Sequence, residues 1–435
     1  MPPRPLSALF TTVFITLALV SIGTAMEVRQ VDTTKVWEQP QQPQKSLTQV
    51  LADIPKTIAS TPVYIVEGIA WIGIETIYSS EFLYEIARTL ISPVPYQGFV
   101  PVGGYGSNVG LELGGKLGYR NVFVRKDYMR TIATYSTHHY QRYGFKYDSP
   151  FLYGDNGGAL FTIDYRNEPY ESFYGLGNST SAGDEVAYTL ESTRLRLDHT
   201  ITLSSWMEGL LGIDYSITNV FNGENDDHLN SLDGIRERFE LSHEQTDVAR
   251  IVTFKAGLVH DWRNHPGQPS AGGIERFVVR YHLGTGRTSD LEYSEVELDA
   301  WHFINLHRQR ILAVRALVRL QDKPGDAAPL PFYLIDGLGG EDALRGYRTD
   351  RFVASDLTLA TAEYRWPIWD VFDAFLFYDI GRVYNDIGND FTWENWHPAY
   401  GFGVRLWGDD GTRLKVTTAF SDETTRFYLQ VGEEF

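Results

Sequence analysis

Apolar and polar residues alternate with a period of two through most of this chain. In residues 312–320 the even positions are all apolar, whereas Arg315 and Arg319 lie among the odd positions. Successive side chains of a strand point to opposite faces, so each such segment has one apolar and one polar face. Soluble sandwiches alternate too, but their strands average only about 5–6 residues. The alternating segments 185–203 and 291–305 are longer. The pattern predicts an all-β fold, a transmembrane antiparallel β-barrel.

The end of the chain has the pattern of a final barrel strand. Phe427, Leu429, Val431 and Phe435 share one face of an extended strand, and the residues between them are mostly polar. An apolar outer face, a polar inner face and a terminal aromatic residue are typical of the last strand of an outer-membrane barrel. Glu433 departs from this pattern, because the third position from the end of such strands is usually apolar.

The connections between the predicted strands alternate in length. The short connections are at residues 155–158, 203–205, 306–308 and 409–411, and the long connections are at residues 171–184, 222–247, 321–355 and 386–397. Outer-membrane barrels have short periplasmic turns and longer external loops. The rhythm therefore agrees with the alternation within the strands.

The N-terminal region has a different character. Arg4, an apolar run over residues 9–22 and the small residues Gly23-Thr24-Ala25 form the pattern of a cleaved secretory signal. We therefore predict three parts: a signal peptide at residues 1–25, a periplasmic linker with an amphipathic helix at residues 26–96, and an outer-membrane barrel at residues 97–435.

The predicted helix covers residues 62–91. One face gathers Glu67, Glu75, Glu81, Glu85 and Arg88, and most of the rest is apolar, with Ile65, Ile69, Trp71, Ile72, Ile77, Phe82 and Ile86. The embedded glutamates disfavour a membrane-spanning helix. Three places stay open for this helix: the bilayer surface, the underside of the barrel and the barrel lumen.

Composition excludes several classes of protein. The chain has 435 residues, no cysteine and a net charge of −18. Disulfides and thiolate metal sites are therefore excluded, and a nucleic-acid partner is disfavoured. The sequence contains no nucleophile elbow, zinc-protease motif or phosphate-binding loop. We predict that the protein is not an enzyme and has no catalytic residues, cofactor or metal site.

Three motifs follow one another in the C-terminal third. They are Leu344-Arg345-Gly346-Tyr347, Glu363-Tyr364-Arg365-x-Pro367 and Phe377-x-Asp379-x-Gly381. In this order and spacing they resemble signatures of the BamA/TamA-type outer-membrane assembly and translocation superfamily, also called bacterial surface antigen. The resemblance covers roughly residues 97–435 and implies a barrel of sixteen strands. Well-known members carry periplasmic POTRA modules before the barrel, but residues 26–95 do not have the strand pattern of such a module.

The same motifs predict an ionic lock between a loop and the barrel wall. Pleat parity places Glu363 and Asp379 on polar strand faces, within reach of Arg345 on the long loop. A guanidinium suits bidentate pairing with carboxylates. The resemblance implies that this pairing is the role of the signature, and the predicted site residues are Arg345, Gly346, Tyr347, Glu363, Asp379 and Gly381.

The resemblance implies a role in outer-membrane protein insertion and assembly or in polypeptide translocation. The alternatives are a passive porin-like channel and a surface-exposed structural or adhesin barrel. The expected location is the outer membrane of a Gram-negative type of cell. The expected partners are outer-membrane lipid and client proteins, and the sequence leaves the oligomeric state open.

Overall fold

A computed structural model describes residues 98–106, 109–124, 126–223, 230–307, 309–325, 328–369, 372–408 and 411–431. The predicted signal peptide, the linker and the helix at residues 62–91 lie outside the described residues, as does the region in which POTRA modules are not expected. Glu433 and Phe435 lie outside them as well.

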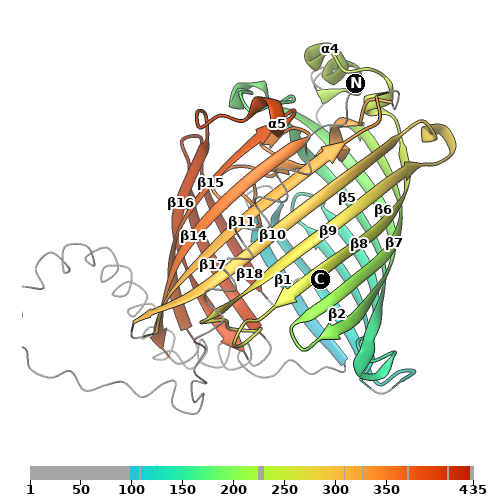
Figure 1. The fold of residues 1–435 in the computed structure, drawn as a ribbon. Coiled ribbons are helices and arrows are strands. Elements are labelled where there is room, and N and C mark those ends of the chain that lie inside the picture. Colours follow the sequence, from blue (N-terminus) through green and yellow to red (C-terminus); the bar gives the residue numbers. More distant parts are fainter. Residues whose placement is uncertain are drawn as a thin grey trace, which may run out of the picture. The chain divides into compact units, whose positions relative to one another are not determined.

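Sixteen of the described strands form one closed antiparallel barrel (Figure 1). These strands are β1 (Gly98–Gly106), β2 (Gly110–Arg120), β3 (Tyr128–Ser136), β4 (Gln141–Ser149), β5 (Gly157–Phe173), β6 (Val186–Ser204), β7 (Met207–Asn222), β8 (Ala249–Asp261), β9 (Gly272–Gly284), β10 (Glu292–His307), β11 (Arg310–Asp322), β14 (Asp356–Trp369), β15 (Phe372–Tyr384), β16 (His397–Gly408), β17 (Gly411–Phe420) and β18 (Thr425–Val431). Each strand pairs with its neighbours in this order, and β1 pairs with β18 to close the ring. The predicted all-β antiparallel barrel of sixteen strands is confirmed.

The remaining described elements lie in the connections. Strands β12 (Gly337–Leu338) and β13 (Phe352–Val353) form a separate two-stranded sheet between β11 and β14. Helix α4 (Leu232–Phe239) follows β7, and the short helix α5 (Ile387–Asp390) follows β15. Single 3₁₀ turns lie at Gly154–Asn156, Ala182–Asp184, Glu244–Thr246, Gly286–Thr288 and Phe332–Leu334. Across the described residues, no helix combines the length and the apolar character needed to span a membrane.

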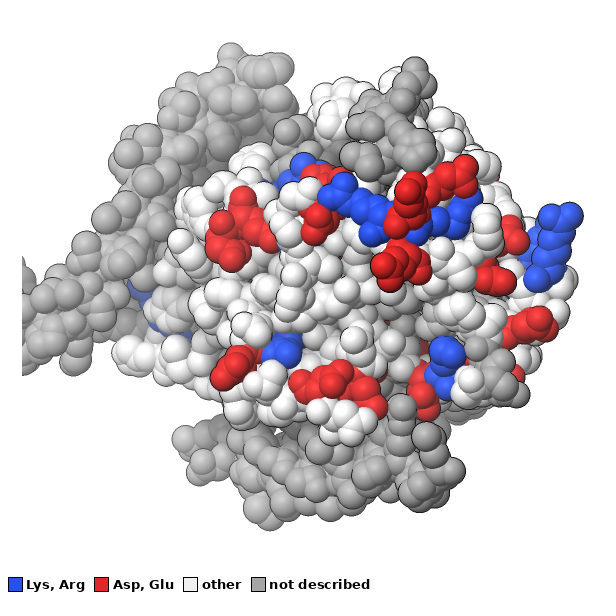
Figure 2. Space-filling model, turned by 90° about the horizontal axis from the view of Figure 1, so that it is seen from above, with Lys and Arg blue, Asp and Glu red and all other residues white. Residues whose placement is uncertain are grey.

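The antiparallel order sorts the connections by length. The four longest, after β5, β7, β11 and β15, all lie at one end of the barrel, which we call the long-loop end; it carries α4 and α5 in Figure 1. The connections after β2, β4, β6 and β16 lie at the opposite, short-turn end. Figure 2 looks down on the long-loop end and shows acidic side chains gathered there among basic ones.

Side-chain exposure follows the predicted alternation. On β15, Phe377 and Asp379 are buried within the barrel, whereas Tyr378 between them is 47% exposed on the outside. On β18, Tyr428 is buried and Phe427 is exposed. The outer face is thus apolar and the inner face carries the charges, because lipid excludes unpaired charge and the lumen does not.

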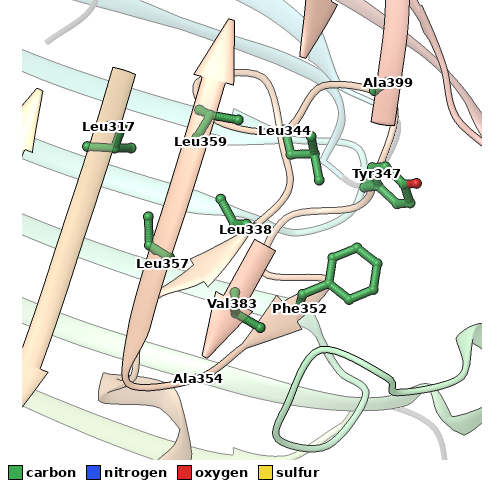
Figure 3. Close-up of a cluster of buried hydrophobic side chains, with 10 residues drawn as sticks. All are labelled: Leu317, Leu338, Leu344, Tyr347, Phe352, Ala354, Leu357, Leu359, Val383 and Ala399. Carbon is green, nitrogen blue, oxygen red and sulfur yellow. The ribbon is translucent and has the colours of Figure 1, made fainter. Parts of the chain in front are cut away.

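Residues 323–355, called the long loop below, fold back against the inner wall. Leu338, Leu344, Tyr347 and Phe352 of this loop are at most 1% exposed. They pack against the wall residues Leu317, Leu357, Leu359, Val383 and Ala399 in a cluster shown in Figure 3. This apolar contact fixes the loop against β11, β14, β15 and β16, and places its polar residues near the charges of the wall.

Candidate loop-to-barrel site

Arg345 of the long loop contacts Asp379 of β15 through two parallel hydrogen bonds. Its Nε donates to Oδ2 and its Nη2 donates to Oδ1, each at 2.7 Å. The Arg345 backbone N–H also donates to Oδ2, and the Thr361 hydroxyl donates to Oδ1 at 2.8 Å. The guanidinium carbon lies 3.5 Å from the centre of the Phe377 ring. Asp379 is 0% exposed, so this carboxylate has exchanged water for four protein donors.

Glu363 of β14 joins Arg345 to a second group of charges. Arg345 Nη1 donates to one Glu363 oxygen at 3.2 Å, while Arg365 Nε donates to the other at 2.6 Å. Arg405 of β16 lies 3.2 Å from Glu363 and donates to Asp373 at 3.0 Å. All six side chains are at most a tenth exposed. Three arginines and three carboxylates balance in formal charge, as a buried cluster requires.

Gly346 and Tyr347 attach the loop to the turn between β17 and β18. The Gly346 carbonyl accepts hydrogen bonds from Ser421 Oγ at 2.9 Å and Thr424 Oγ1 at 2.6 Å. The Tyr347 hydroxyl donates to Asp422 Oδ1 at 2.5 Å. The turn at residues 421–424 therefore holds the loop at the residues that directly follow Arg345.

Gly381 serves a different purpose from Gly346. A Cβ at Gly381 would lie 2.9 Å from Leu338 Cδ1, so its missing side chain leaves room for the loop to lie against the wall. The structure thus places all six predicted site residues around one contact between the long loop and strands β14 and β15.

Gly346 also has a backbone conformation that favours glycine. Its φ is +92°, and a Cβ would lie 3.0 Å from the carbonyl carbon of Phe420. We expect Gly346→Ala to weaken the loop contact more than Gly154→Ala, because Gly154 has φ +67° but no atom within 4 Å of its Cβ position and lies at the short-turn end, away from the long loop. The control carries only the left-handed backbone cost of about 1–2 kcal/mol. Limited proteolysis of the long loop measures the difference, and equal cleavage of the two variants would contradict this reading.

A second arginine contact was not predicted from the sequence. Arg351 is 1% exposed and donates from Nε and Nη2 to the two carboxylate oxygens of Glu423, each at 2.7 Å. It also donates to the hydroxyl and the carbonyl of Thr180, each at 2.8 Å. Its guanidinium lies over the Tyr174 ring at 4.4 Å. Arg351 therefore ties the long loop to two other connections at the same end of the barrel.

The other side of the long loop faces a cavity of about 630 Å³ in the lumen. Its lining includes Arg194, Lys255 and Arg276 of the wall and Asp336 and Asp350 of the loop. Enclosure raises the pKa of Asp350 to about 6, with the nearby Asp336 carboxylate adding to the effect. Arg319 of β11 lies 3.1 Å from Asp336 and supports the loop from that side.

The described residues contain no group of three or more His, Asp or Glu side chains arranged to hold a metal ion. The charged side chains near the loop are instead paired with one another. Their arrangement suits holding a loop in place.

The described part of the closure between β1 and β18 consists of a few residue pairs. Four residue pairs, Gly103↔Val431 to Gly106↔Tyr428, are in register among the described residues, compared with seven pairs between β17 and β18. We call this β1–β18 contact the seam. Three of the four β1 residues that form it are glycines, Gly103, Gly104 and Gly106. Glycine weakens a strand.

Comparison with known proteins identifies the family. The model of the Omp85 superfamily domain matches residues 121–435. A structure of BamA from Haemophilus ducreyi lacking POTRA domains 1–3 is similar, with a TM-score of 0.57, 15% sequence identity and coverage of 77% of this chain and 70% of that chain. CdiB from Escherichia coli has a TM-score of 0.51, 16% identity and coverage of 78% and 63%. CdiB from Acinetobacter baumannii has a TM-score of 0.47, 15% identity and coverage of 77% and 59%.

The similarities to BamA and to CdiB from Escherichia coli show a shared fold. The chain spans less than two thirds of either CdiB chain. No curated protein sequence matches the chain significantly. The resemblance predicted from the three motifs is confirmed by the family match, and so is the outer-membrane location of the Gram-negative type. The chain belongs to the Omp85 superfamily of outer-membrane β-barrels.

Proposed function

We propose that this barrel inserts client polypeptides into the outer membrane or translocates them across it. In this proposal the long loop is an ionic lock and the seam is the part of the barrel that opens. The observation that carries the proposal is the buried, charge-balanced contact of Arg345 with Asp379 and Glu363. A buried ion pair that loses one partner leaves an uncompensated charge, so this contact favours a fully bound loop over a partly detached one. Such a loop suits a barrel that changes state.

The seam supports the same proposal. Unpaired backbone groups in lipid are costly, so a barrel opens most easily where the fewest pairs must separate. The seam has four described pairs, whereas the contact between β14 and β15 has thirteen. The long loop is attached to the turn at residues 421–424, which leads directly into β18. Loop position and seam pairing therefore share one hairpin.

A passive porin-like channel is the second candidate. The charged lumen cavity supports it, because its lining resembles the wet wall of a pore. A porin, however, conducts through a barrel that stays closed, so a seam with four described pairs would have no role in it. The two candidates separate in one comparison: client-barrel insertion or polypeptide passage in proteoliposomes, against conductance in planar bilayers. Large steady conductance without insertion or passage would overturn our proposal.

A disulfide across the seam tests the mechanism directly. Tyr105 and Leu429 are partners in register, and the chain has no native cysteine. Antiparallel partners have Cα separations of about 4.5–5.5 Å, within the range that a disulfide spans. We expect the Tyr105→Cys/Leu429→Cys variant to lose activity when oxidised and to regain it after reduction.

The matched control for the seam disulfide is Thr418→Cys/Phe427→Cys, which joins the register partners of β17 and β18. This disulfide links two strands that stay paired in either state of the seam, so activity is expected to be the same before and after reduction. Full activity of the oxidised seam variant would show that the barrel works without opening there.

A further inference from the structure

An apolar tip projects from the turn between β2 and β3 at the short-turn end. Val122, Phe123 and Val124 are consecutive and are 36%, 75% and 40% exposed. Basic residues stand on both sides of them, Arg120 before and Lys126 after, and the sequence has a further arginine at position 125. Three adjacent exposed apolar side chains in a seven-residue turn mark a contact surface rather than a plain connection.

The tip has a fixed conformation. Asp127 is 0% exposed and its carboxylate accepts hydrogen bonds from the backbone N–H groups of Val122, Phe123 and Val124 at 2.6, 2.8 and 2.9 Å. The Tyr147 hydroxyl donates to the same carboxylate at 3.0 Å. The three backbone N–H groups point to the carboxylate on the inner side of the turn. The three apolar side chains are therefore held on its outer side.

The neighbouring turn after β4 extends this surface. Phe151, Leu152 and Tyr153 are 43%, 43% and 47% exposed. Lys126 Nζ lies 4.3 Å from the centre of the Phe151 ring, which brings the two turns together. We call the six residues Val122, Phe123, Val124, Phe151, Leu152 and Tyr153 the turn-tip patch.

Strand β1 begins close to this patch. Gly98, the first residue of β1, pairs with Gly118 of β2, three residues before the turn begins. Residues 92–97 contain Pro93 and Pro95, which favour an extended chain and the end of a helix. Six extended residues span at most about 20 Å. The C-terminal end of the predicted helix at residues 62–91 is therefore tethered within reach of the patch.

Charge and apolar content of that helix complement the patch. The predicted helix carries four acidic residues and one basic residue, Arg88. The acidic residues are Glu67, Glu75, Glu81 and Glu85. The rest of its circumference is largely apolar, and an isolated helix of this kind needs an apolar surface to cover. The patch offers apolar side chains beside Lys126. Opposite charges fix the orientation of such a contact more than its strength.

We propose that residues 62–91 dock on the turn-tip patch, with their apolar side chains covering Phe123 and Phe151 and their glutamates facing the basic residues of the β2–β3 turn. The helix then lies under the barrel, next to β1 and hence next to one side of the seam. This interaction is independent of whether the barrel inserts or translocates polypeptide.

Disulfide trapping in the full chain in proteoliposomes tests the docking. Phe123→Cys is combined in turn with Ile77→Cys, Phe82→Cys and Ile86→Cys, in a chain free of native cysteine. A docked helix raises the effective concentration of its contact positions, so at least one pair is expected to crosslink on the order of tenfold faster than the same helix cysteine with Trp393→Cys, a site on the long-loop end. Heat-dependent gel migration verifies that each variant is folded.

Two other outcomes would overturn the proposal. Preferential crosslinking of the helix cysteines to Arg194→Cys, a position that lines the lumen cavity, would place the helix inside the barrel. Quenching of a fluorophore on Phe123→Cys by brominated phospholipids, without any helix crosslink, would show that lipid covers the patch. As a charge test, Lys126→Glu is expected to slow the trapping and Glu85→Lys to restore it. The absence of both effects would contradict docking with the glutamates against the basic residues of the turn.

Discussion

Replacing Arg345 with alanine is expected to destabilise the long loop by roughly 3–5 kcal/mol, the usual cost of leaving a buried charge without its partner. Asp379 is fully buried and receives three of its four hydrogen bonds from Arg345. Without the guanidinium, this carboxylate and one oxygen of Glu363 lose their closest cation. We expect the loop to leave the wall while the barrel stays closed, with a large loss of activity.

Limited proteolysis of the loop and denaturant unfolding in lipid vesicles measure the effect of Arg345→Ala. The matched control is Arg238→Ala on α4, whose ion pair with Asp184 is partly exposed and is worth at most about 1 kcal/mol. The double variant Arg345→Met/Asp379→Asn removes a cation and an anion together, so it is expected to be less destabilised than Arg345→Ala alone. Unchanged loop cleavage and activity in Arg345→Ala would refute the ionic lock.

Removing the Arg351 side chain is the second change with a large expected effect. Arg351→Met keeps much of the apolar stem but loses both hydrogen bonds to Glu423 and both to Thr180. Hydrogen bonds to charged groups contribute about 1.5–3 kcal/mol each relative to an unsatisfied partner, and Glu423 recovers part of this from water. We expect a loss of about 2–3 kcal/mol in loop stability.

The location of Arg351 makes a specific functional effect testable. Glu423 lies in the turn that directly precedes β18. Arg351→Met is therefore expected to raise the rate of amide hydrogen exchange in β18 as well as in the long loop. Arg348→Met is the matched control, because Arg348 lies on the same loop but its pair with Glu185 is about a third exposed on both sides. In a double-mutant cycle, Arg351→Met and Glu423→Gln should show a coupling of about 1–3 kcal/mol. Additive effects would mean that the two residues act separately.

The sequence predicted the direction of side chains on the barrel wall better than the contacts made by the loops. Strand parity alone placed Glu363 and Asp379 inside the barrel, since the period of two holds wherever one face meets lipid. Pairing of Arg345 with them depended on the motifs and on the resemblance. The contact of Arg405 with Asp373 depends on the register of β15 and β16, which no local pattern specifies.

No sequence pattern predicted the contact between Arg351 and Glu423. They lie in irregular connections 72 residues apart, where neither helical nor strand periodicity indicates the direction of a side chain. Their contact depends on how the long loop folds over the apolar cluster around Leu338 and Tyr347, which is a property of the whole tertiary structure. The left-handed φ of Gly346 is likewise visible only once the loop is placed.

The seam has a consequence for how this protein folds. It joins the first and last strands of the barrel, so almost the entire described chain must be in place before these partners can meet. Contacts between distant parts of a chain form late, because the entropy lost in closing the intervening loop is not recovered until the contact is complete. The four pairs described at the seam recover little of that entropy cost. Closure of the ring is therefore expected to be the slow, final step of folding, and until then β1 and β18 are two open edges that invite pairing with other chains.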